Sequence, residues 1–573
     1  MSQVQQTSGG SLLADRLHAT GVKTIFSLAG AGHTHLLLPL EDLGVRIVST
    51  RHESGAVGAA DGYARATGEI GVAAIIAEQG LPNAVSPIST AMHAGSPLVV
   101  LATRFPDSWV EADGEVPVDH HQMISGVCKW VRTVPSADKL IEYFDTACRI
   151  ATAGRPGPVV LVIPQNFLMA PCHPSIVELP HVPNPPIVNA TDIRKIADMI
   201  VAANHPVVLM DSGAVPKKGE EAKVYAALNK FNKDFDVPIF TYGQARGLIP
   251  EDNESVLPWP FGQLVLPEID LLIVVGTRLN MWFGFGRAPR FPENMKTVQI
   301  DIEAETIHRN NQVTFGAVGD PATAIQDLAL ELNDRGFSAG SLRWLDGALA
   351  ERKALVEERK SGNNKEIHAL ELIQQVEKNR PKDGIFVGDG ADILNWSQAL
   401  VRIARPRGYL DHHPLGSMGV CLPMALGAAA AERDIATAQN RAPKRTTLLT
   451  GDGSLGFYIA ELDTIAREGL LLTIIVGNDA QWGTEVHGQR LMTKRTVSTV
   501  LDWVDYAKVA QGFGLEAHTV NTRDELNGAI EQAYTDTGPK LVNVRIDPAA
   551  GMELKINPQL TFLIFSDLAP PNR

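Results

Sequence analysis

The stretch TTLLTGDGSLGFYIAELDTIAREGLLLTIIVGND, residues 446–479, decides the fold prediction. It contains two apolar runs, TTLLT and LLTIIVGN, and an acidic residue follows each run, at Asp452 and at Asp479. Runs that stay apolar rather than alternating are typical of parallel strands buried on both faces. A parallel pair needs a crossover connection, and the residues between the runs are numerous enough to form one. The stretch therefore predicts a strand–helix–strand unit with polar groups at the carboxyl ends of its strands.

The same pattern recurs along the chain. Further apolar runs occupy residues 45–50, 71–77, 97–103, 158–164, 206–210, 271–276, 298–302 and 541–547. Helix-like stretches separate them, which predicts an α/β fold with several doubly wound parallel sheets. A proline-rich stretch (165–188) and a polar, glycine-containing stretch (333–366) read as linkers. They divide the chain into domains at 1–185, 190–335 and 365–573.

Composition excludes several classes of protein. The chain has 573 residues, 45% of them apolar, and a net charge of −14, which argues against binding to nucleic acid or to an anionic membrane surface. Its four cysteines, Cys128, Cys148, Cys172 and Cys421, are far apart, so neither a zinc ribbon nor a disulfide scaffold is expected. The N-terminus lacks the pattern of a signal peptide, and no apolar run approaches the length of a membrane span. We expect a cytoplasmic protein.

Asp452 and Asp479 point to a metal site. Open α/β sheets place their ligands at the carboxyl ends of strands, where these two residues are expected to lie. Carboxylate oxygens at two neighbouring strand ends can share one Mg²⁺ ion, whose remaining ligands would come from phosphates. Gly451 and Gly453 flank Asp452 and would let the backbone approach a phosphate closely.

Three motifs, in this order along the chain, resemble those of the thiamine-diphosphate (ThDP) enzymes. They are RHESGAVGAADGYARATG (51–68), LGSMGVCLPMALGAAAA (415–431) and the GDG-to-ND stretch that begins at 451. The resemblance covers the whole chain and matches the group that contains acetohydroxyacid synthase, benzaldehyde lyase and oxalyl-CoA decarboxylase. It implies a pyrimidine-binding, a middle and a diphosphate-binding domain. Within the group the chain looks most similar to benzaldehyde lyase, which shares LGSMGV, TGDGS and the Trp-Gly pair after the metal loop.

The resemblance implies roles for individual residues. Glu53 corresponds to the glutamate that bonds the pyrimidine ring and activates the cofactor. Asp452, Asp479 and the backbone carbonyl of Gln481 correspond to the Mg²⁺ ligands. Asp479 departs from the family's Asn, and its extra charge would partly offset the attraction of the diphosphate for the metal site. Further cofactor contacts are implied for the Met418 wedge and for Gly416, Gly390, Ala391, Gly451, Gly453 and Ser454.

The acid that protonates the reaction intermediate is left open among Glu485, His33 and His120, and His412 is a further candidate for a functional role. Glu485 lies where pyruvate decarboxylases place a glutamate, and His33 lies near the place of a histidine of benzaldehyde lyase. His120, followed by a second histidine, is close to where the group has a glutamine, a position that falls on Pro117 here. His412 falls where benzaldehyde lyase has a histidine near its pocket.

The resemblance implies a ThDP- and Mg²⁺-dependent lyase and carboligase. Such an enzyme cleaves and forms 2-hydroxy ketones through an enamine, with a small carbonyl compound or acyloin as substrate. The alternatives are a 2-hydroxyacyl-CoA lyase or an oxalyl-CoA decarboxylase-like enzyme, then a 2-oxo acid decarboxylase or an acetolactate synthase-like enzyme. A catalytically silent binding member is least favoured, because Glu53, Asp452 and Asp479 are all present. The C-terminal tail carries only Lys555 and Arg573 as cations, which weighs against an acyl-CoA substrate.

Two more properties follow from the resemblance. Related proteins bind FAD or ADP in the middle domain through an arginine and an acid at a strand end. Arg278 and Asp301 occupy those places, so a nucleotide is left open there. Family members are homo-oligomers, dimers or tetramers, in which the active site is shared between the first domain of one chain and the third domain of another.

Overall fold

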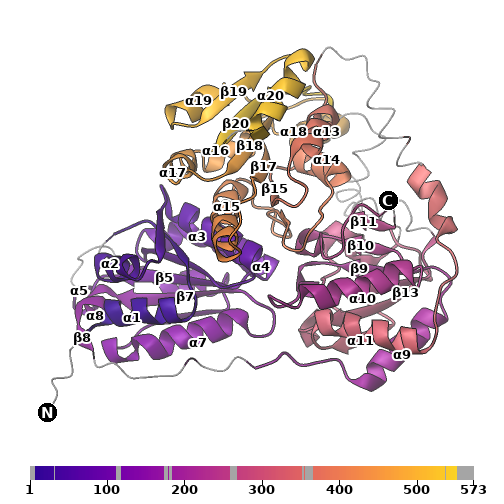
Figure 1. The fold of residues 1–573 in the computed structure, drawn as a ribbon, viewed down its shortest axis with the longest axis horizontal. Coiled ribbons are helices and arrows are strands. Elements are labelled where there is room, and N and C mark those ends of the chain that lie inside the picture. The colour runs from indigo at the N-terminus through magenta and orange to yellow at the C-terminus, as the bar shows by residue number, and fades with distance from the viewer. Residues whose placement is uncertain are drawn as a thin grey trace. The chain divides into compact units, whose positions relative to one another are not determined.

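Three six-stranded parallel sheets form the framework of the chain (Figure 1). The computed structural model describes residues 7–550 apart from 31, 111–117, 173–178, 180–182, 254, 259–267, 289, 351–353, 355–365 and 536. The first sheet contains β2 (Thr24–Ser27), β3 (Arg46–Ser49), β4 (Gly71–Ile76), β5 (Leu98–Arg104), β6 (Trp130–Thr133) and β7 (Pro158–Pro164). The middle sheet contains β9 (Pro206–Met210), β10 (Ile239–Thr241), β11 (Val256–Pro258), β12 (Leu271–Val275), β13 (Lys296–Asp301) and β14 (Phe315–Val318). The third sheet contains β15 (Phe386–Gly388), β16 (Tyr409–Leu410), β17 (Thr446–Gly451), β18 (Leu472–Asn478), β19 (Glu516–Val520) and β20 (Lys540–Arg545).

Helices connect the strands. The first part of the chain contributes α1 (Gly9–Ala19), α2 (Thr34–Asp42), α3 (Glu53–Thr67), α4 (Gly80–Ala94), α5 (Asp107–Val110), α6 (His120–Ile124), α7 (Leu140–Thr152) and α8 (Gln165–Met169). The middle part contributes α9 (Ala190–Val201), α10 (Glu221–Lys233) and α11 (Pro321–Asp334). The last part contributes α13 (Ala369–Asn379), α14 (Asp392–Leu400), α15 (Cys421–Ala438), α16 (Asp452–Phe457), α17 (Glu461–Arg467), α18 (Gly483–Thr493), α19 (Tyr506–Gly512) and α20 (Arg523–Thr535). A short antiparallel ribbon pairs β1 (Thr7–Ser8) with β8 (Pro171–Cys172).

The predicted α/β fold is confirmed. Each apolar run predicted as a strand forms one, and its ends lie within two residues of the predicted ends. These strands pair in parallel, and all of them except β3 are buried along most of their length, which explains why their sequences do not alternate.

The first and third sheets have the same strand order, although the chain has no short internal sequence repeat. Their orders are β3-β2-β4-β5-β7-β6 and β16-β15-β17-β18-β20-β19. The middle sheet has the order β11-β10-β9-β12-β13-β14, which is that of dinucleotide-binding folds. In such sheets the strand order reverses at a switch point, which lies between β2 and β4, between β9 and β12, and between β15 and β17. Ligands are expected at the carboxyl ends of these strand pairs.

By their contacts, the described residues form two compact units. The first comprises 1–184, 412–446 and 457–472, and the second comprises 185–411, 447–456 and 473–573. The predicted third domain thus contributes to both units, because α15 and α17 pack with the first.

Helix α15 joins the first unit by packing closely against α3. All residues of α3 are buried, as are most of those of α15, and both helices are rich in Ala and Gly. A Cβ atom added at Gly427 of α15 would lie 1.8 Å from the carbonyl oxygen of Ala59 in α3. The backbones therefore approach more closely than any larger residue at Gly427 would allow.

We expect Gly427→Ala to destabilise the protein by about 1–3 kcal/mol, because the added methyl group forces the two helices apart. Gly528→Ala is the matched control. Gly528 also lies inside a helix, α20, but a Cβ atom there would meet nothing within 4 Å. That variant should be more stable by about 0.5–1 kcal/mol, since alanine favours helix. Calorimetric unfolding would measure both changes, and equal stabilities would contradict the packing.

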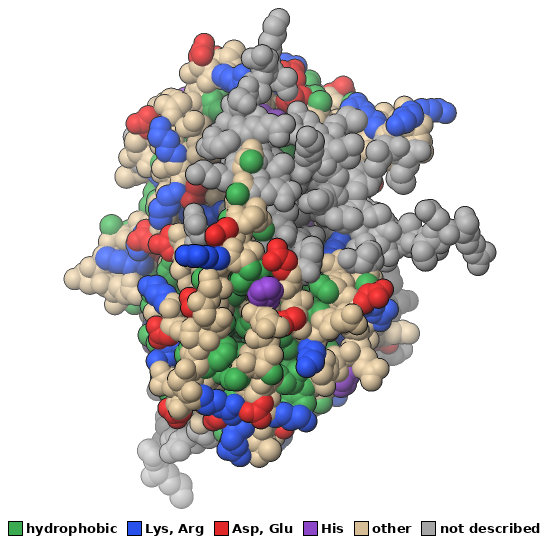
Figure 2. Space-filling model, turned by 90° about the vertical axis from the view of Figure 1, so that its right-hand side faces the viewer, with side chains coloured by type: hydrophobic (Ala, Val, Ile, Leu, Met, Phe, Trp, Pro, Cys, Tyr) green, Lys and Arg blue, Asp and Glu red, His purple; other side chains and the backbone are tan. Residues whose placement is uncertain are grey.

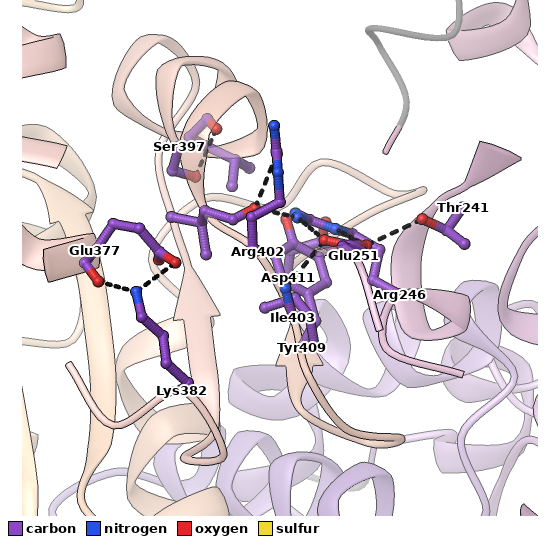
Figure 3. Close-up of polar contacts among 12 residues, drawn as sticks. Thr241, Arg246, Glu251, Glu377, Lys382, Ser397, Arg402, Ile403, Tyr409 and Asp411 are labelled. Carbon is purple, nitrogen blue, oxygen red and sulfur yellow. Dashed lines mark hydrogen bonds and ion pairs between the residues drawn. The ribbon is translucent and has the colours of Figure 1, made fainter. Parts of the chain in front are cut away.

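In the second unit, a buried ion pair joins the middle sheet to the third sheet (Figure 3). The Arg246 guanidinium donates to both carboxylate oxygens of Glu251, at 3.0 and 2.7 Å, and both side chains are almost completely buried. Arg246 also donates to the Val401 carbonyl at 2.6 Å and lies 4.4 Å from the ring centroid of Tyr409. Glu251 accepts from the Ile403 amide at 3.1 Å, while its own amide donates to the Ile403 carbonyl at 3.1 Å. The pair therefore fixes the segment that leads into β16.

The face of the molecule drawn in Figure 2 carries charged side chains of both signs. On the face drawn in Figure 2, Lys and Arg side chains lie among Asp and Glu side chains rather than in a continuous basic patch. In the part of the chain that the structure describes, no helix combines the length and apolar character needed to cross a bilayer.

Candidate active site

Three of the predicted catalytic residues of the first unit lie at the switch point of its sheet, around the carboxyl end of β4. Glu53 begins α3, and its Cγ atom is 2.9 Å from the position that a Cβ atom would take on Gly80. His33 and His120 contact the carbonyl oxygens of Ile75 and Ala77. The structure therefore gathers Glu53, His33 and His120 at the edge of the sheet where ligands bind.

Glu53 is held in place through both its backbone and its carboxylate. Its predecessor His52 caps α3, since the His52 ring accepts from the Ser54 amide at 3.2 Å. The Asn83 amide on α4 donates to Oε2 of Glu53 at 3.0 Å. Glu53 is 8% exposed, and its Oε1 has no hydrogen-bond partner among the described residues. Sequence reasoning missed Asn83, because nothing in LPNAVS marks it as a partner of a glutamate so far away in the chain.

The predicted pyrimidine-binding segment also belongs to the first unit. Ser417 lies between Gly416 and Met418, and its hydroxyl is 2.6 Å from that of Ser86 on α4. Since Asn83 and Ser86 are one turn apart on α4, this helix connects Glu53 with the segment. Met418 is half-buried just before α15, and the Gly416 amide donates to the His412 carbonyl at 3.0 Å.

His33 is fully engaged by neighbouring groups. Its Nδ1 accepts from the Gly30 amide at 2.8 Å, so Nε2 carries the proton and donates to the Ile75 carbonyl at 3.2 Å and to Thr103 Oγ1 at 3.0 Å. Burial lowers the pKa of His33 to about 4, which keeps the ring neutral. These contacts give His33 a structural place at the edge of the sheet.

His120 differs from His33 in having a ring nitrogen without a partner. One nitrogen bonds the Ala77 carbonyl and must therefore carry the proton. Nε2 is buried and has no hydrogen-bond partner among the described residues. Burial, together with the nearby Arg104 charge, lowers the pKa of His120, so Nε2 is a free base at neutral pH.

The two other predicted catalytic residues, His412 and Glu485, have different surroundings. His412 is buried beside His413, with ring centroids 4.7 Å apart. Glu485, on the first turn of α18, is exposed and makes no hydrogen bond or ion pair with any described residue. Pro117, where the group has its glutamine, and the C-terminal tail from 551 lie outside the described residues.

In the second unit, the predicted diphosphate residues gather at the switch point between β15 and β17. The position of a Cβ atom on Gly390 lies 3.4 Å from the Gly451 amide nitrogen and 3.5 Å from Ser454 Oγ. Ala391 caps the N-terminus of α14. The ring of Trp482 covers Gly453, 2.5 Å from the position of its Cβ atom. These loops form a glycine-lined cradle with backbone amides, which suits a phosphate group.

Asp452 and Asp479 are adjacent in this cradle, and their carboxyl groups hydrogen-bond to each other. Burial raises the pKa of Asp452 and, with the neighbouring Asp452 charge, raises that of Asp479. Gln481 follows, with its side chain donating to the Pro548 carbonyl at 2.7 Å. No third acidic, histidine or cysteine side chain completes a metal cluster within the described residues. Two crowded carboxylates with a phosphate cradle beside them fit a divalent cation, because a cation relieves their repulsion.

Comparison with known families agrees with this arrangement. The N-terminal TPP binding domain of the thiamine pyrophosphate enzymes matches residues 7–124, their central domain matches 193–328, and their C-terminal TPP binding domain matches 389–544. The chain belongs to the thiamine pyrophosphate enzyme family. Thiamine pyrophosphate is ThDP, so the prediction of a ThDP-dependent enzyme is confirmed.

Characterised thiamine pyrophosphate enzymes resemble the chain over nearly its full length. A 2-hydroxyacyl-CoA lyase 2 of Danio rerio is 27% identical over 560 residues, which cover 90% of this chain and 87% of that protein. A 2-hydroxyacyl-CoA lyase 2 of Caenorhabditis elegans is 28% identical, covering 94% and 89%. An acetolactate synthase large subunit of Mycobacterium tuberculosis is 26% identical, covering 96% and 98%. The similarity to benzaldehyde lyase in particular stays a prediction.

The middle domain of this thiamine pyrophosphate enzyme does not fit the FAD or ADP that the resemblance left open. At its switch point, buried Asp211 accepts from the Ser212 amide at 2.6 Å and from Thr277 Oγ1 at 3.0 Å, and the Gly213 amide donates to the Gly276 carbonyl at 2.9 Å. The Ser212 and Gly213 amides are thus bonded within the protein and are not free for a pyrophosphate, and the Asp211 carboxylate beside them does not favour an anion. Arg278 pairs with Glu303 at 3.1 Å, and Asp301 accepts from the Glu303 amide at 2.9 Å. We therefore assign no nucleotide to the described residues of this switch point.

Beside the glycine-lined cradle lies His487, a residue that sequence reasoning missed. His487 on α18 is 6% exposed, and neither ring nitrogen has a hydrogen-bond partner among the described residues. Its Nε2 lies 3.6 Å from a carboxylate oxygen of Asp392, which follows the cradle residues Gly390 and Ala391. Helical spacing places His487 one turn after Gly483, but a lone histidine in a helix gives no sequence signal of this position.

Proposed function

We propose that the chain is a ThDP- and Mg²⁺-dependent lyase and carboligase that cleaves and forms the carbon–carbon bond of 2-hydroxy ketones. The main support is the placement of two sets of residues at the switch points of two sheets with equal strand order. One set presents a buried glutamate, Glu53, and the other presents the acidic pair Asp452 and Asp479 beside a phosphate cradle. When bound, ThDP supplies a nucleophilic carbon and an electron sink for the bond that breaks.

In this proposal Glu53 exchanges the proton that activates the cofactor. Asn83 holds Oε2, and Oε1 makes no hydrogen bond with any described residue. Because Glu53 is almost fully buried, water does not compete for that proton.

His120 is the proposed proton carrier for the substrate. Its free Nε2 can take a proton from a hydroxyl group of the substrate and return one to carbon, while the bond to the Ala77 carbonyl holds the ring. His33 has no nitrogen to spare for this task. Glu485 is exposed and its side chain makes no hydrogen bond or ion pair with any described residue, and His412 is buried beside His413, so neither residue has comparable support.

Asp452 and Asp479, with the Gln481 carbonyl, are the proposed Mg²⁺ ligands. Since the pKa of each carboxyl group is raised, protons compete with the metal increasingly as the pH falls. We expect the Mg²⁺ affinity, titrated calorimetrically at saturating ThDP, to weaken between about pH 8 and pH 6. Asp479→Asn removes one of the two competing protons, so its affinity should depend less steeply on pH. If the Mg²⁺ affinity of the variant depended on pH as steeply as that of the wild type, Asp452 and Asp479 would not bind the metal together.

A 2-hydroxyacyl-CoA lyase is the second candidate, because relatives with this name align over most of the chain. Such an enzyme would use the same proton transfers and the same metal site. It would differ in needing a binding site for the coenzyme A moiety.

A proton NMR time course distinguishes the candidates. The protein, loaded with ThDP and Mg²⁺, would receive benzoin, an aliphatic acyloin, pyruvate, benzoylformate and a 2-hydroxyacyl-CoA in separate samples. We expect an acyloin to yield two aldehydes while the oxo acids persist. Cleavage of the CoA thioester alone would favour the second candidate, and loss of CO₂ from an oxo acid alone would refute both.

We also propose that the active enzyme is a dimer or tetramer with shared active sites. This rests on membership of the family and on the resemblance described above. Glu53 would then act with the Asp452 and Asp479 of a second copy.

A further inference from the structure

A second buried glutamate lies at the start of α3. Glu461, the first residue of α17, is 1% exposed. Its Oε1 and Oε2 accept from the Arg51 amide at 3.1 and 3.3 Å, and the carboxylate also accepts from the His52 amide. Arg51 and His52 are the two residues before Glu53.

The rest of α17 holds the same turn. Arg467 donates to the Ser49 carbonyl at 2.6 Å, and Asp463 lies 3.7 Å from the Arg51 guanidinium. The turn 49–52, which connects β3 to α3, is therefore bonded to α17 at three of its four residues.

The Glu461 carboxylate itself has little freedom to move. Thr464 Oγ1 donates to its Oε2 at 2.7 Å. A Cβ atom at Gly55 would lie 2.0 Å from its Oε1, so the carboxylate packs directly against the first turn of α3. Only glycine at that position leaves room for it. A negative group at this place also interacts favourably with the positive, N-terminal end of the dipole of α3.

We propose that Glu461 is a positioning residue for Glu53: its carboxylate fixes the backbone of turn 49–52 and thereby sets where the Glu53 carboxyl group lies. The inference rests on the proposed role of Glu53. Glu461 follows the GDG motif closely in the chain, so the motif that binds diphosphate and the residue that orients the activating glutamate are parts of one connected segment. Small displacements of a catalytic group reduce rates steeply, by about 10²-fold for 1 Å.

Glu461→Gln tests this inference. The amide keeps one acceptor oxygen but turns an NH₂ group toward the backbone amides, so we expect kcat to fall about tenfold, with KM changed less than about twofold. Exchange of the C2 proton of bound ThDP should slow by the same factor. In the apoprotein, hydrogen–deuterium exchange of the Arg51 and His52 amides should become faster, a result that does not depend on activity. Thr464→Val, which loosens the carboxylate without removing it, should shift all three measurements in the same direction but less.

Glu468→Gln is the control. Glu468 lies at the end of the same helix, but its carboxylate pairs with Arg433 and not with turn 49–52. It should leave the three measurements unchanged. If Glu461→Gln and Thr464→Val alter the melting temperature but neither amide exchange nor C2 exchange, Glu461 is merely structural and the inference is wrong. If Glu53→Gln retains C2 exchange, the proposed function fails instead, so the two failures are distinguishable.

Discussion

Glu53→Gln should reduce kcat by about 10²–10⁴-fold while leaving the fold intact. The substitution preserves the size of the side chain and its hydrogen bond with Asn83, but it removes the group that can hold a proton at Oε1. The start of α3 stays capped by His52 and bonded to Glu461. We therefore expect ThDP binding and thermal stability to change little, and the loss to appear in kcat and in exchange of the cofactor's C2 proton.

Glu41→Gln, an exposed glutamate at the end of α2, is the control for loss of a carboxylate from the same unit. It should behave like the wild type. Turnover of Glu53→Gln near the wild-type rate would contradict the proposed mechanism. Mixing Glu53→Gln with Asp452→Ala, each inactive alone, should restore activity if the sites are shared between chains. Absence of recovery after subunit exchange would contradict shared sites.

The sequence was sufficient to predict the strands and the polar residues at the carboxyl ends of two sheets. Buried parallel strands are marked by local runs of apolar residues, so β17 and β18 could be located, with Asp452 and Asp479 at their ends. The three motifs then placed Glu53 and the pyrimidine-binding segment. All of this information is contiguous in the chain.

The contacts that orient these groups could not be predicted, because they join residues far apart in sequence. Asn83, Glu461 and Ser86 are common residue types in unremarkable surroundings, and only the packing of α4 and α17 brings them to the site. The same reason applies to α15, which lies in the predicted third domain but packs with the first unit.

The choice among the histidines also required the structure. His33 and His120 both lie beside the end of β4. They differ in their hydrogen bonds. Both ring nitrogens of His33 have partners, which include the Gly30 amide and Thr103 Oγ1. In His120, by contrast, Nε2 has no partner among the described residues.

Arg246→Met should destabilise the protein by about 3–5 kcal/mol. Without the guanidinium, the Glu251 carboxylate is left buried, and its remaining partners among the described residues are neutral: Thr241 Oγ1 at 3.0 Å and the Ile403 amide at 3.1 Å (Figure 3). Neither partner offsets the loss of hydration of a full charge. The Val401 carbonyl loses its donor as well. Urea unfolding would measure the change.

Arg278→Met is the matched control, because Arg278 also pairs with a glutamate of the middle domain but is about one-third exposed there. Water screens that pair, so its loss should change stability by no more than about 1 kcal/mol. If the two variants lost the same free energy of unfolding, burial would not explain the contribution of the Arg246–Glu251 pair to stability.

The double variant Arg246→Met/Glu251→Leu separates the cost of an unpaired charge from the value of the pair. If each single variant is unstable mainly because it leaves a buried charge alone, then removing both charges abolishes that penalty. What remains is the loss of hydrogen bonds to the Val401 carbonyl, the Ile403 amide and Thr241 Oγ1, about 1–3 kcal/mol for each group left unsatisfied. We therefore expect the double variant to be clearly more stable than the sum of the two single losses predicts, with a coupling free energy of up to about 3 kcal/mol. Additive losses would instead show that the two side chains act independently at the joint between the two sheets.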